Sequence, residues 1–498
     1  TKERFLSLRE MILKYHLSPD EVDRLIGEIS RRKSKQYSSV ESNNFSEELF
    51  PPYFINEAEK CYKNFKGANE LYDFDDLEEG LIEMLKDGVF LENLRKSFDW
   101  IMVDEFQDLN DVQLKILQEI STDSYFFAVG DEDQCIYEFR GSNTDAMVNF
   151  PEYFKDGKKL YLKYNYRSSE TIVSCANTII CNNVKRNQKS ILNKRMDKTS
   201  IQIRKVLDEK ASAEAVSKMI GRIPKTETTA VIVRTNKEME AIMRTLSKAG
   251  ITFSLIEKPY DIYGGWIIKD LTAFMEFAIF NRREPLLRIM DKAGLGISKE
   301  VKEEIRNNYF KTPAQILLDS CDKSYKKEEV LSFIEKLDKL KKMKPENAVD
   351  WILYGLKYSR FLEMAAFKNN TSIHGYIAEI KDFKDRISFF DSIADLIEWL
   401  IEYRRIMELK QDTMDKVVLT TMHGSKGMEF DNVFIMNAVE GNIPHERSLK
   451  GDEGERRLFY VAVTRAKNDL YIIVPKKING TARQISEYIM ESSLVKLV

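Results

Sequence analysis

The stretch Ile101-Met102-Val103-Asp104-Glu105-Phe106-Gln107-Asp108 predicts a buried strand that ends in acidic residues. A second apolar run at 125–129 ends in Gly130-Asp131, and between the two runs apolar residues recur at helical spacing from Val112 to Leu117. A buried strand, a helix and another buried strand in succession are typical of a parallel sheet. The sequence therefore predicts an α/β fold.

The rest of the chain divides into strand-rich and helical parts. Further strands are predicted at 160–162, 230–233, 416–421, 433–436 and 470–474. The stretch 266–402 has a helical pattern without strand signals, and residues 1–88 are also mostly helical in pattern, with a loop at Pro51-Pro52. The simplest prediction is a helical block inserted into an α/β domain.

The composition excludes several classes of protein. The 498 residues hold 77 Lys plus Arg against 80 Asp plus Glu, a net charge of −3, so any nucleic-acid surface must be local. The five cysteines form no CxxC pair and there are four histidines, which argues against a zinc site or a disulfide framework. Because no apolar run is long enough for a membrane span and no signal peptide opens the chain, we expect a cytoplasmic protein without a membrane partner.

The acid pair after the first strand suits phosphate chemistry. Ligands bind at the carboxyl edge of a parallel sheet. There, Asp104 could hold Mg²⁺ through water, and Glu105 could orient and deprotonate an attacking water. By itself the pair is equally compatible with two solvated residues at a strand end.

The segment 129–141 carries a second set of candidates. Gln134 follows a tight turn at a strand end and could sense a γ-phosphate. Tyr137 and Phe139 could stack on nucleic-acid bases. Out of context, ordinary core packing is the commoner role for such aromatic residues.

Three further motifs stand at predicted strand ends or helix starts, namely Tyr164-Asn165-Tyr166-Arg167-Ser168-Ser169, residues 420–430 and residues 455–466. An isolated arginine in such a motif is usually a surface charge. In order and composition, however, the five motifs together resemble the motor motifs of superfamily 1 helicases of the UvrD/Rep/PcrA type. Tyr72-Asp73-Phe74-Asp75-Asp76-Leu77 also resembles the segment that precedes the acid pair in that family.

This resemblance implies two RecA-like parallel-sheet lobes, the first of them incomplete, with helical inserted domains. The implied divisions are residues 1–88 (helical insert of the first lobe), 89–157 (the remaining part of the first lobe), 158–264 (second lobe, first part), 265–404 (helical insert of the second lobe) and 405–498 (second lobe, second part).

The resemblance also assigns roles to individual residues. Those implied for ATP and Mg²⁺ are Asp104 (magnesium, through water), Glu105 (catalytic base), Gln134 (γ-phosphate sensor), Tyr166 (adenine), Arg167 and Arg465 (γ-phosphate) and Glu429 (ribose). Those implied for DNA are Tyr137, Phe139, Arg140, Thr421 and His423. In such a motor the lobes close on ATP and step 3′ to 5′ along single-stranded DNA, and duplex junctions are further partners.

One motif of the family is missing from the sequence. The pattern G-x-x-x-x-G-K-[ST] does not occur, and the nearest candidates, Gly157-Lys158 and Ser425-Lys426-Gly427, lack the loop. In the family this loop precedes the first helical insert, and the resemblance implies that the chain begins within that insert. Three explanations are open: a partial sequence, which we favour, a separate chain that carries the segment, or a derivative without ATPase activity.

Two functions follow from these alternatives. The first is an ATP-dependent DNA helicase or translocase whose phosphate-binding loop lies outside these residues, so that the chain alone is inactive. The second is a non-catalytic DNA-binding or partner-binding module on a helicase scaffold. Retention of a base, a sensor and two arginines favours the first, because a binding module does not need them together.

Overall fold

The computed structural model describes residues 7–8, 11, 15, 19–37, 50–138, 141–195, 199–258, 261, 263–320, 324–368, 373–408, 415–446, 448 and 452–497. The chain divides into two compact units. One consists of Asp23–Lys258 and Gln411–Val498, and the other of Thr1–Val22 and Pro259–Lys410. The larger unit groups several of the predicted domains, and the smaller one holds the predicted insert 265–404 with part of 1–88, so the predicted domain boundaries remain predictions.

The larger unit contains a six-stranded sheet with the strand order β5-β10-β9-β6-β8-β7, in which every neighbouring pair is parallel. Its strands are β5 (Ile201–Val206), β6 (Thr229–Val233), β7 (Ser254–Leu255), β8 (Val417–Thr421), β9 (Phe430–Ile435) and β10 (Ala466–Pro475). Strand β6 is buried at every position, as expected where helices cover both faces of a parallel sheet. The predicted α/β class is confirmed.

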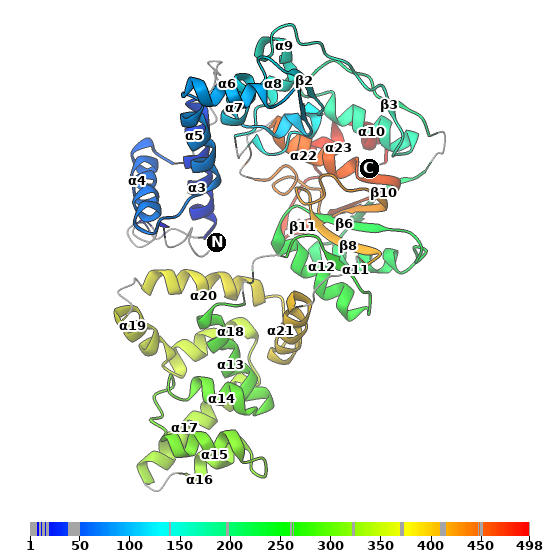
Figure 1. The fold of residues 1–498 in the computed structure, drawn as a ribbon. Coiled ribbons are helices and arrows are strands. Elements are labelled where there is room, and N and C mark those ends of the chain that lie inside the picture. The colour runs from blue at the N-terminus through cyan, green and yellow to red at the C-terminus, as the bar shows by residue number, and fades with distance from the viewer. Residues whose placement is uncertain are drawn as a thin grey trace. The chain divides into compact units, whose positions relative to one another are not determined.

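Helices cover both faces of this sheet (Figure 1). α11 (Glu209–Ile220) and α12 (Asn236–Lys248) lie on one face, and α10 (Glu170–Ile180) and α22 (Glu453–Val463) lie on the other. The apolar side chains of α10 and α22 pack with those of the strands into the main core of the unit. Shorter elements complete it: β3 (Tyr164–Asn165), β4 (Leu192–Asn193), the hairpin β11 (Lys477–Ile478) and β12 (Thr481–Ala482), α23 (Glu487–Met490) and η5 (Ser493–Leu497).

A second, smaller sheet consists of the parallel strands β1 (Trp100–Val103) and β2 (Tyr125–Ala128). They are joined by α7 (Asp111–Ile120), as the sequence predicts. One face of the sheet packs on a small core that includes Phe106 and Leu114. The other face is exposed and apolar: Trp100 is 58%, Met102 70%, Tyr125 68% and Phe127 54% exposed. The surrounding elements are α6 (Gly88–Lys96), η1 (Phe106–Asp108), η2 (Glu132–Gln134), α8 (Thr144–Val148) and α9 (Phe150–Tyr153).

The predicted strand at 160–162 is wrong. Leu160 and Leu162 are each 92% exposed, so the apolar run that suggested a strand is not buried. Pairing begins only at Lys163, whose carbonyl accepts a hydrogen bond from the backbone N–H of Leu192 at 2.7 Å. An apolar run predicts a strand only where another element covers it.

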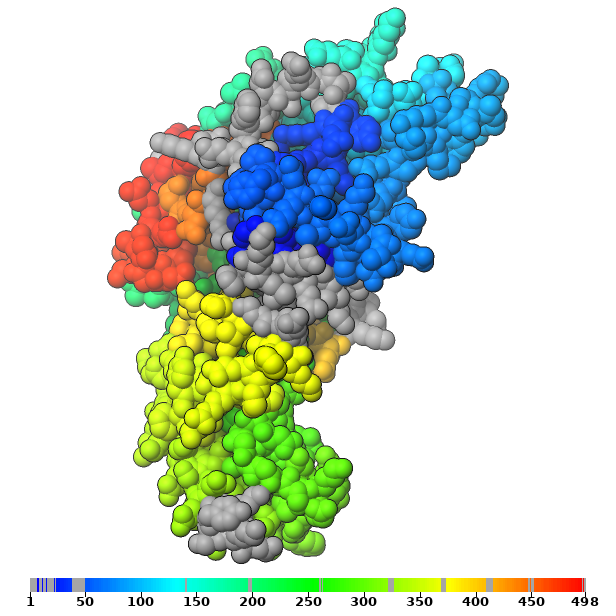
Figure 2. Space-filling model, turned by 90° about the vertical axis from the view of Figure 1, so that its left-hand side faces the viewer, coloured from blue at the N-terminus to red at the C-terminus, as the bar shows by residue number. Residues whose placement is uncertain are grey.

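The N-terminal part of the larger unit contains α4 (Pro52–Ala68), α5 (Phe74–Met84) and most of α3 (Pro19–Lys35), from Asp23 onward. The predicted break at Pro51-Pro52 is the start of α4, where proline suits the first turn. The outer surface of α4 faces the viewer in Figure 2 and is largely exposed.

The other unit is helical throughout its described residues from Trp266 to Glu408. Its elements are α13 (Trp266–Phe280), α14 (Arg283–Ile289), α15 (Lys299–Asn307), α16 (Pro313–Asp319), α17 (Ser324–Leu340), α18 (Pro345–Asp350), η4 (Trp351–Gly355), α19 (Tyr358–Lys368), α20 (Ile373–Ile387) and α21 (Ile393–Glu408). α13 is almost entirely buried and forms the centre of the unit. Among the described residues, no helix has both the length and the apolar character needed to span a membrane.

Candidate active site

The acid pair lies in solvent-exposed turns directly after β1. The backbone N–H of Glu105 donates to Oδ1 of Asp104 at 2.9 Å, and Glu105 has a left-handed φ of 50°. This conformation is uncommon for a residue with a side chain and occurs more often at functional sites. Both carboxylates are therefore accessible at the carboxyl edge of the small sheet.

The donor set at this edge fits Mg²⁺ better than an all-protein metal cage. Within the described ranges, no three His, Cys, Asp or Glu side chains gather as ligands for one ion. Magnesium usually keeps several waters and takes one or two carboxylates together with phosphate oxygens. The exposed Asp104 suits that mode, since it leaves room for water and a substrate phosphate.

Gln107 connects the two strand ends and is a residue that sequence reasoning missed. Its side chain is fully buried. Its Nε2 donates to Glu105 at 2.5 Å, and its Oε1 accepts from the backbone N–H of Asp131 at 2.9 Å. A Cβ at Gly130 would lie 2.4 Å from that oxygen, so glycine is needed there. The amide fixes Glu105 relative to the turn after β2.

The turn after β2 holds Gln134. Asp131 caps η2 by accepting from the backbone N–H of Asp133 at 3.1 Å, and it accepts from Nε2 of Gln134 at 2.8 Å. The Gln134 Oε1 accepts from a terminal nitrogen of Arg465 at 3.2 Å. The predicted sensor and one predicted arginine are therefore in contact.

Arg465 is 1% exposed and lies two residues past the end of α22. Besides Gln134, its guanidinium donates to the carbonyl oxygens of Val461 at 2.9 Å and Met428 at 3.1 Å. Burial lowers the pKa of Arg465 to about 10, and Arg167 adds to this effect. A surface salt bridge, the alternative role for this arginine, does not describe its surroundings.

The second predicted arginine is held by the residue predicted to contact ribose. Nε of Arg167 donates to Glu429 at 2.7 Å, and Lys467 binds the other oxygen of that carboxylate at 2.8 Å. Lys467 and Arg167 lower the pKa of Glu429 by hydrogen bonding. Tyr166 is 68% exposed beside Arg167, so its ring is free to cover a planar ligand.

Lys426 is another residue whose role the sequence did not reveal. Its ammonium group binds Asp108 at 2.5 Å and the carbonyl oxygen of Gln134 at 2.9 Å, and its side chain is 9% exposed. Burial raises the pKa of Asp108, an effect that Lys426 opposes. Lys426 thus ties the segment after β8 to both strand ends of the small sheet. A sequence signal existed, because this lysine stands within a recognised motif.

The residues predicted to contact DNA are only partly brought together. Tyr137 and His423 have ring centroids 6.2 Å apart, and the Lys426 ammonium lies 5.3 Å from the Tyr137 ring centre. Thr421 ends β8, and its hydroxyl accepts from the backbone N–H of Gly424 at 3.0 Å. Tyr137 also packs against the main core, so stacking and core packing are both compatible with its position. Phe139 and Arg140 lie outside the described residues.

A parallel α/β sheet with acidic residues directly after a strand is an architecture that binds ligands, nucleotides among them, at the carboxyl edge of the sheet. Comparison with known families agrees. Residues 3–155 match the UvrD/REP helicase N-terminal domain, and residues 160–477 match the UvrD-like helicase C-terminal domain. The chain belongs to the UvrD-like helicase family.

Similar proteins carry helicase names. The chain is 30% identical over 452 residues to the putative ATP-dependent DNA helicase YjcD of Bacillus subtilis, covering 86% of this chain and 58% of that protein. It is 29% identical over 493 residues to the ATP-dependent DNA helicase PcrA of Staphylococcus epidermidis, covering 92% of this chain and 66% of the relative. The PcrA of Staphylococcus aureus is 30% identical over 440 residues, with 82% and 60% covered. The chain thus spans less than two thirds of the length of these relatives.

Proposed function

We propose that this chain forms the larger part of an ATP-driven DNA helicase or translocase that moves 3′ to 5′ on single-stranded DNA. The contact between Gln134 and Arg465 carries the proposal. It joins the turn after β2 to the end of α22, so one side-chain pair links the acid-bearing sheet to the arginine-bearing sheet. A binding module has no use for such a pair, whereas a motor needs communication across this point.

Each side chain near this contact has a part in hydrolysis under the proposal. Glu105 orients and deprotonates the attacking water, and Gln134 contacts the γ-phosphate. Arg167 and Arg465 stabilise the charge that develops on the transferred phosphoryl group, a role worth about 10³–10⁵ in rate in related motors. Glu429 and Tyr166 hold the ribose and the adenine. When bound through Asp104, Mg²⁺ would neutralise part of the phosphate charge.

The DNA strand would cross the same unit. Tyr137 offers a ring for base stacking, and Thr421 and His423 lie at the end of β8, where they can contact the strand. The names of the relatives, which call them ATP-dependent DNA helicases, support DNA as the substrate. Single-stranded DNA and duplex junctions are the forms of DNA that we propose.

Hydrolysis also needs a phosphate-binding loop, and the pattern for it does not occur in the 498 residues. The small sheet offers a place for the polypeptide that would carry it. Two parallel strands with an exposed aromatic face are unusual, because purely parallel sheets are normally covered on both faces. We infer that further strands and helices, in the same or a separate chain, complete this sheet and bring the loop to Asp104 and Glu105.

The experiment begins with the coding DNA immediately upstream of the codon for Thr1. An in-frame Gly-Lys-Thr or Gly-Lys-Ser loop is expected there or in a neighbouring gene. The chain expressed together with that segment should hydrolyse ATP when single-stranded DNA is present. The matched control is Glu105→Gln, which keeps the size of the side chain and removes the base. DNA binding without hydrolysis by the completed protein would instead support a non-catalytic module.

A further inference from the structure

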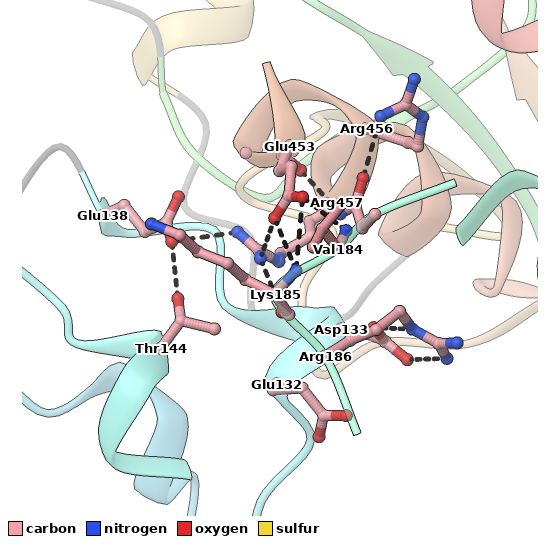
Figure 3. Close-up of polar contacts among 12 residues, drawn as sticks. Glu132, Asp133, Glu138, Thr144, Val184, Lys185, Arg186, Glu453, Arg456 and Arg457 are labelled. Carbon is pink, nitrogen blue, oxygen red and sulfur yellow. Dashed lines mark hydrogen bonds and ion pairs between the residues drawn. The ribbon is translucent and has the colours of Figure 1, made fainter. Parts of the chain in front are cut away.

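Residues 183–189 bind the turn that carries Gln134, and we call this segment the 183–189 clamp. Arg186 binds Asp133 through two hydrogen bonds, at 3.0 and 2.7 Å, and the backbone N–H of Asn187 donates to Glu132 at 2.9 Å. Figure 3 shows the Arg186 guanidinium facing Asp133, with Glu132 beside it. The Asp133 and Glu132 carboxylates are 0% and 2% exposed, so these bonds are made inside the protein.

Lys189 makes the most extensive contacts of the clamp. Its ammonium lies 2.5 Å from Asp131, 3.1 Å from Glu132 and 3.2 Å from Asp133, and its side chain is 13% exposed. An ammonium has three donors, and here three carboxylates surround it. Burial opposes the charges of Asp131 and Lys189, yet the pKa of Asp131 is lowered and that of Lys189 is raised by their mutual attraction.

The clamp itself is anchored to α22. Glu453, in the first turn of that helix, accepts from the backbone N–H groups of Val184 at 2.5 Å and Lys185 at 3.3 Å. Arg457 of the same helix donates to the Lys185 carbonyl at 3.2 Å and binds Glu138 at 2.9 Å (Figure 3). Since α22 leads directly to Arg465, the clamp and that arginine share one rigid support.

These contacts form a closed path. α22 anchors the clamp, Lys189 of the clamp holds Asp131, and Asp131 accepts from Nε2 of Gln134. Gln134 in turn accepts from Arg465 at the end of α22. An amide that is free to rotate could present either nitrogen or oxygen to the arginine. With Asp131 binding the nitrogen, only the oxygen is left for Arg465, and this orientation is the one that suits a guanidinium donor.

We propose that Lys189 is a positioning residue of this motor, which through Asp131 sets the orientation of the Gln134 amide toward Arg465. The effect of Lys189 on catalysis rests on the proposed function, whereas its effect on the orientation of the Gln134 amide does not. Lys189 touches neither nucleotide nor DNA under this proposal. The competing interpretation is that the clamp only stabilises the fold.

The NMR signals of the Gln134 side-chain amide distinguish the two interpretations. They are recorded on protein labelled with ¹⁵N-glutamine, and the Gln134 signals are assigned as those that are missing from Gln134→Ala. Lys189→Met removes the charge that holds Asp131, so the Gln134 signals should shift. Arg186→Met also breaks a buried ion pair to η2, but Arg186 does not contact Asp131, so the signals should stay in place although the melting temperature falls. Lys189→Arg, which restores a cation, should return the signals toward their original position.

Unchanged Gln134 signals in folded Lys189→Met, or equal shifts in Lys189→Met and Arg186→Met, would overturn the proposal. If Lys189→Met does not fold, Lys189→Gln, which keeps an N–H donor group without the charge, provides the same comparison. In protein that hydrolyses ATP, Lys189→Met should lower kcat about 10²-fold with little change in KM, as expected for a misplaced group near the reacting atoms. Lys115→Met, which breaks an exposed pair with Glu119, is the activity control.

Failure of the clamp and failure of the proposed function give different results. If no form of the protein hydrolyses ATP, the NMR comparison still decides whether Lys189 orients Gln134. If the protein hydrolyses ATP and the Gln134 signals do not shift in Lys189→Met, the proposed function is retained and Lys189 has only a structural role.

Discussion

At the scale of single residues, buried hydrogen bonds decide what each polar group can do. Gln134 donates to Asp131 and accepts from Arg465, so both ends of its amide are engaged. A γ-phosphate that approached this point would compete with Gln134 for the same guanidinium. The presence of nucleotide can therefore change the contacts of Gln134, and through the strand end that carries it, those of Tyr137 three residues further on.

Arg465→Ala should abolish most hydrolysis in protein completed with its phosphate-binding loop. Loss of the guanidinium should lower turnover by about 10³ or more. Because Arg465 is buried and donates to two carbonyl oxygens, the melting temperature should also fall. Affinity for single-stranded DNA without nucleotide should barely change.

The control for Arg465 is Arg234→Ala. Arg234 binds Glu455 at 2.6 Å and is 17% exposed, so its loss should also lower the melting temperature. Arg234 is not part of the candidate site, so the turnover of the Arg234→Ala protein should be nearly normal. Near-normal turnover in Arg465→Ala would remove Arg465 from the site.

Tyr137→Ala should weaken binding of single-stranded DNA by about 1–3 kcal/mol if the ring is a stacking platform. Tyr137→Phe keeps the ring and should bind almost as the original protein does. Binding is measured by fluorescence anisotropy with a labelled oligothymidine, and the melting temperature checks the core contacts of Tyr137. Equal affinity in folded Tyr137→Ala would mean that the ring serves packing alone.

How much of the site could be predicted depends on the distance along the chain over which a residue acts. Asp104 and Glu105 follow a visible strand, so a local pattern was enough to find them. Gln107, Lys426 and Lys189 act through partners 24, 318 and 58 positions away, and no local pattern shows such contacts. Their roles needed the three-dimensional structure.

At the scale of elements, burial decides which apolar runs become strands. The runs that became β6, β8, β9 and β10 are covered by helices or other strands, and these were predicted close to their observed positions. The run at 160–162 is exposed and forms no strand. Propensity alone could not distinguish these cases, because the covering helices come from distant parts of the sequence.

The start of α5 offers a test at this scale. Asp73 caps the helix by accepting from the backbone N–H of Asp76 at 2.9 Å, and it binds Lys66 at 2.7 Å. Burial opposes ionisation of Asp73, but hydrogen bonds from Lys66 and from the backbone of Asp76 outweigh it and lower its pKa to about 2 from 3.8. The carboxylate is thus stabilised in the folded state.

The sign of the pH effect follows from this direction. Because the folded-state pKa is lower than the unfolded one, the stabilisation is fully present above the unfolded value near 3.8 and is lost as pH falls toward about 2. Asparagine caps helices about as well as aspartate but cannot form the ion pair. Asp73→Asn should therefore be less stable than the original protein at neutral pH, with the difference shrinking between about pH 4 and pH 2.

Chemical unfolding at a series of pH values measures this difference, and Asp87→Asn serves as the control. Asp87 also caps a helix, accepting from the backbone N–H of Val89 at 2.9 Å, without a basic partner among its hydrogen bonds in the described residues. Its substitution changes a helix cap without removing an ion pair, so it measures the contribution of capping alone. A difference for Asp73→Asn that stays constant from neutral pH to pH 2 would contradict the role of the Lys66 pair.

At the scale of the whole molecule, the residues that the proposed motor needs are unevenly distributed along this chain. Arg465 and the candidate DNA contacts Thr421 and His423 adjoin the six-stranded sheet, whereas Asp104, Glu105 and Gln134 lie in the turns after the two strands of the small sheet, one face of which is exposed. We therefore expect that the chain alone can bind DNA, whereas hydrolysis of ATP needs the polypeptide that completes the small sheet.

The 498-residue chain by itself should bind single-stranded DNA weakly and should not hydrolyse ATP at the rates of about 1–100 s⁻¹ that are ordinary for enzymes. The backbone cradle and lysine of the phosphate-binding loop supply most phosphate binding in this class, so without them the carboxylates have no substrate to act on. DNA affinity should fall as salt rises, because each phosphate contact releases counterions.

Addition of the loop-bearing segment should restore turnover and move the emission of Trp100 to shorter wavelength, since that ring is 58% exposed on the face to be covered. Trp100→Phe is the fluorescence control, and it should lose the spectral change while turnover returns. DNA-stimulated turnover at a motor's rate by the chain alone would show that another part of these residues binds the phosphates, and the small sheet would then need no completing partner for catalysis.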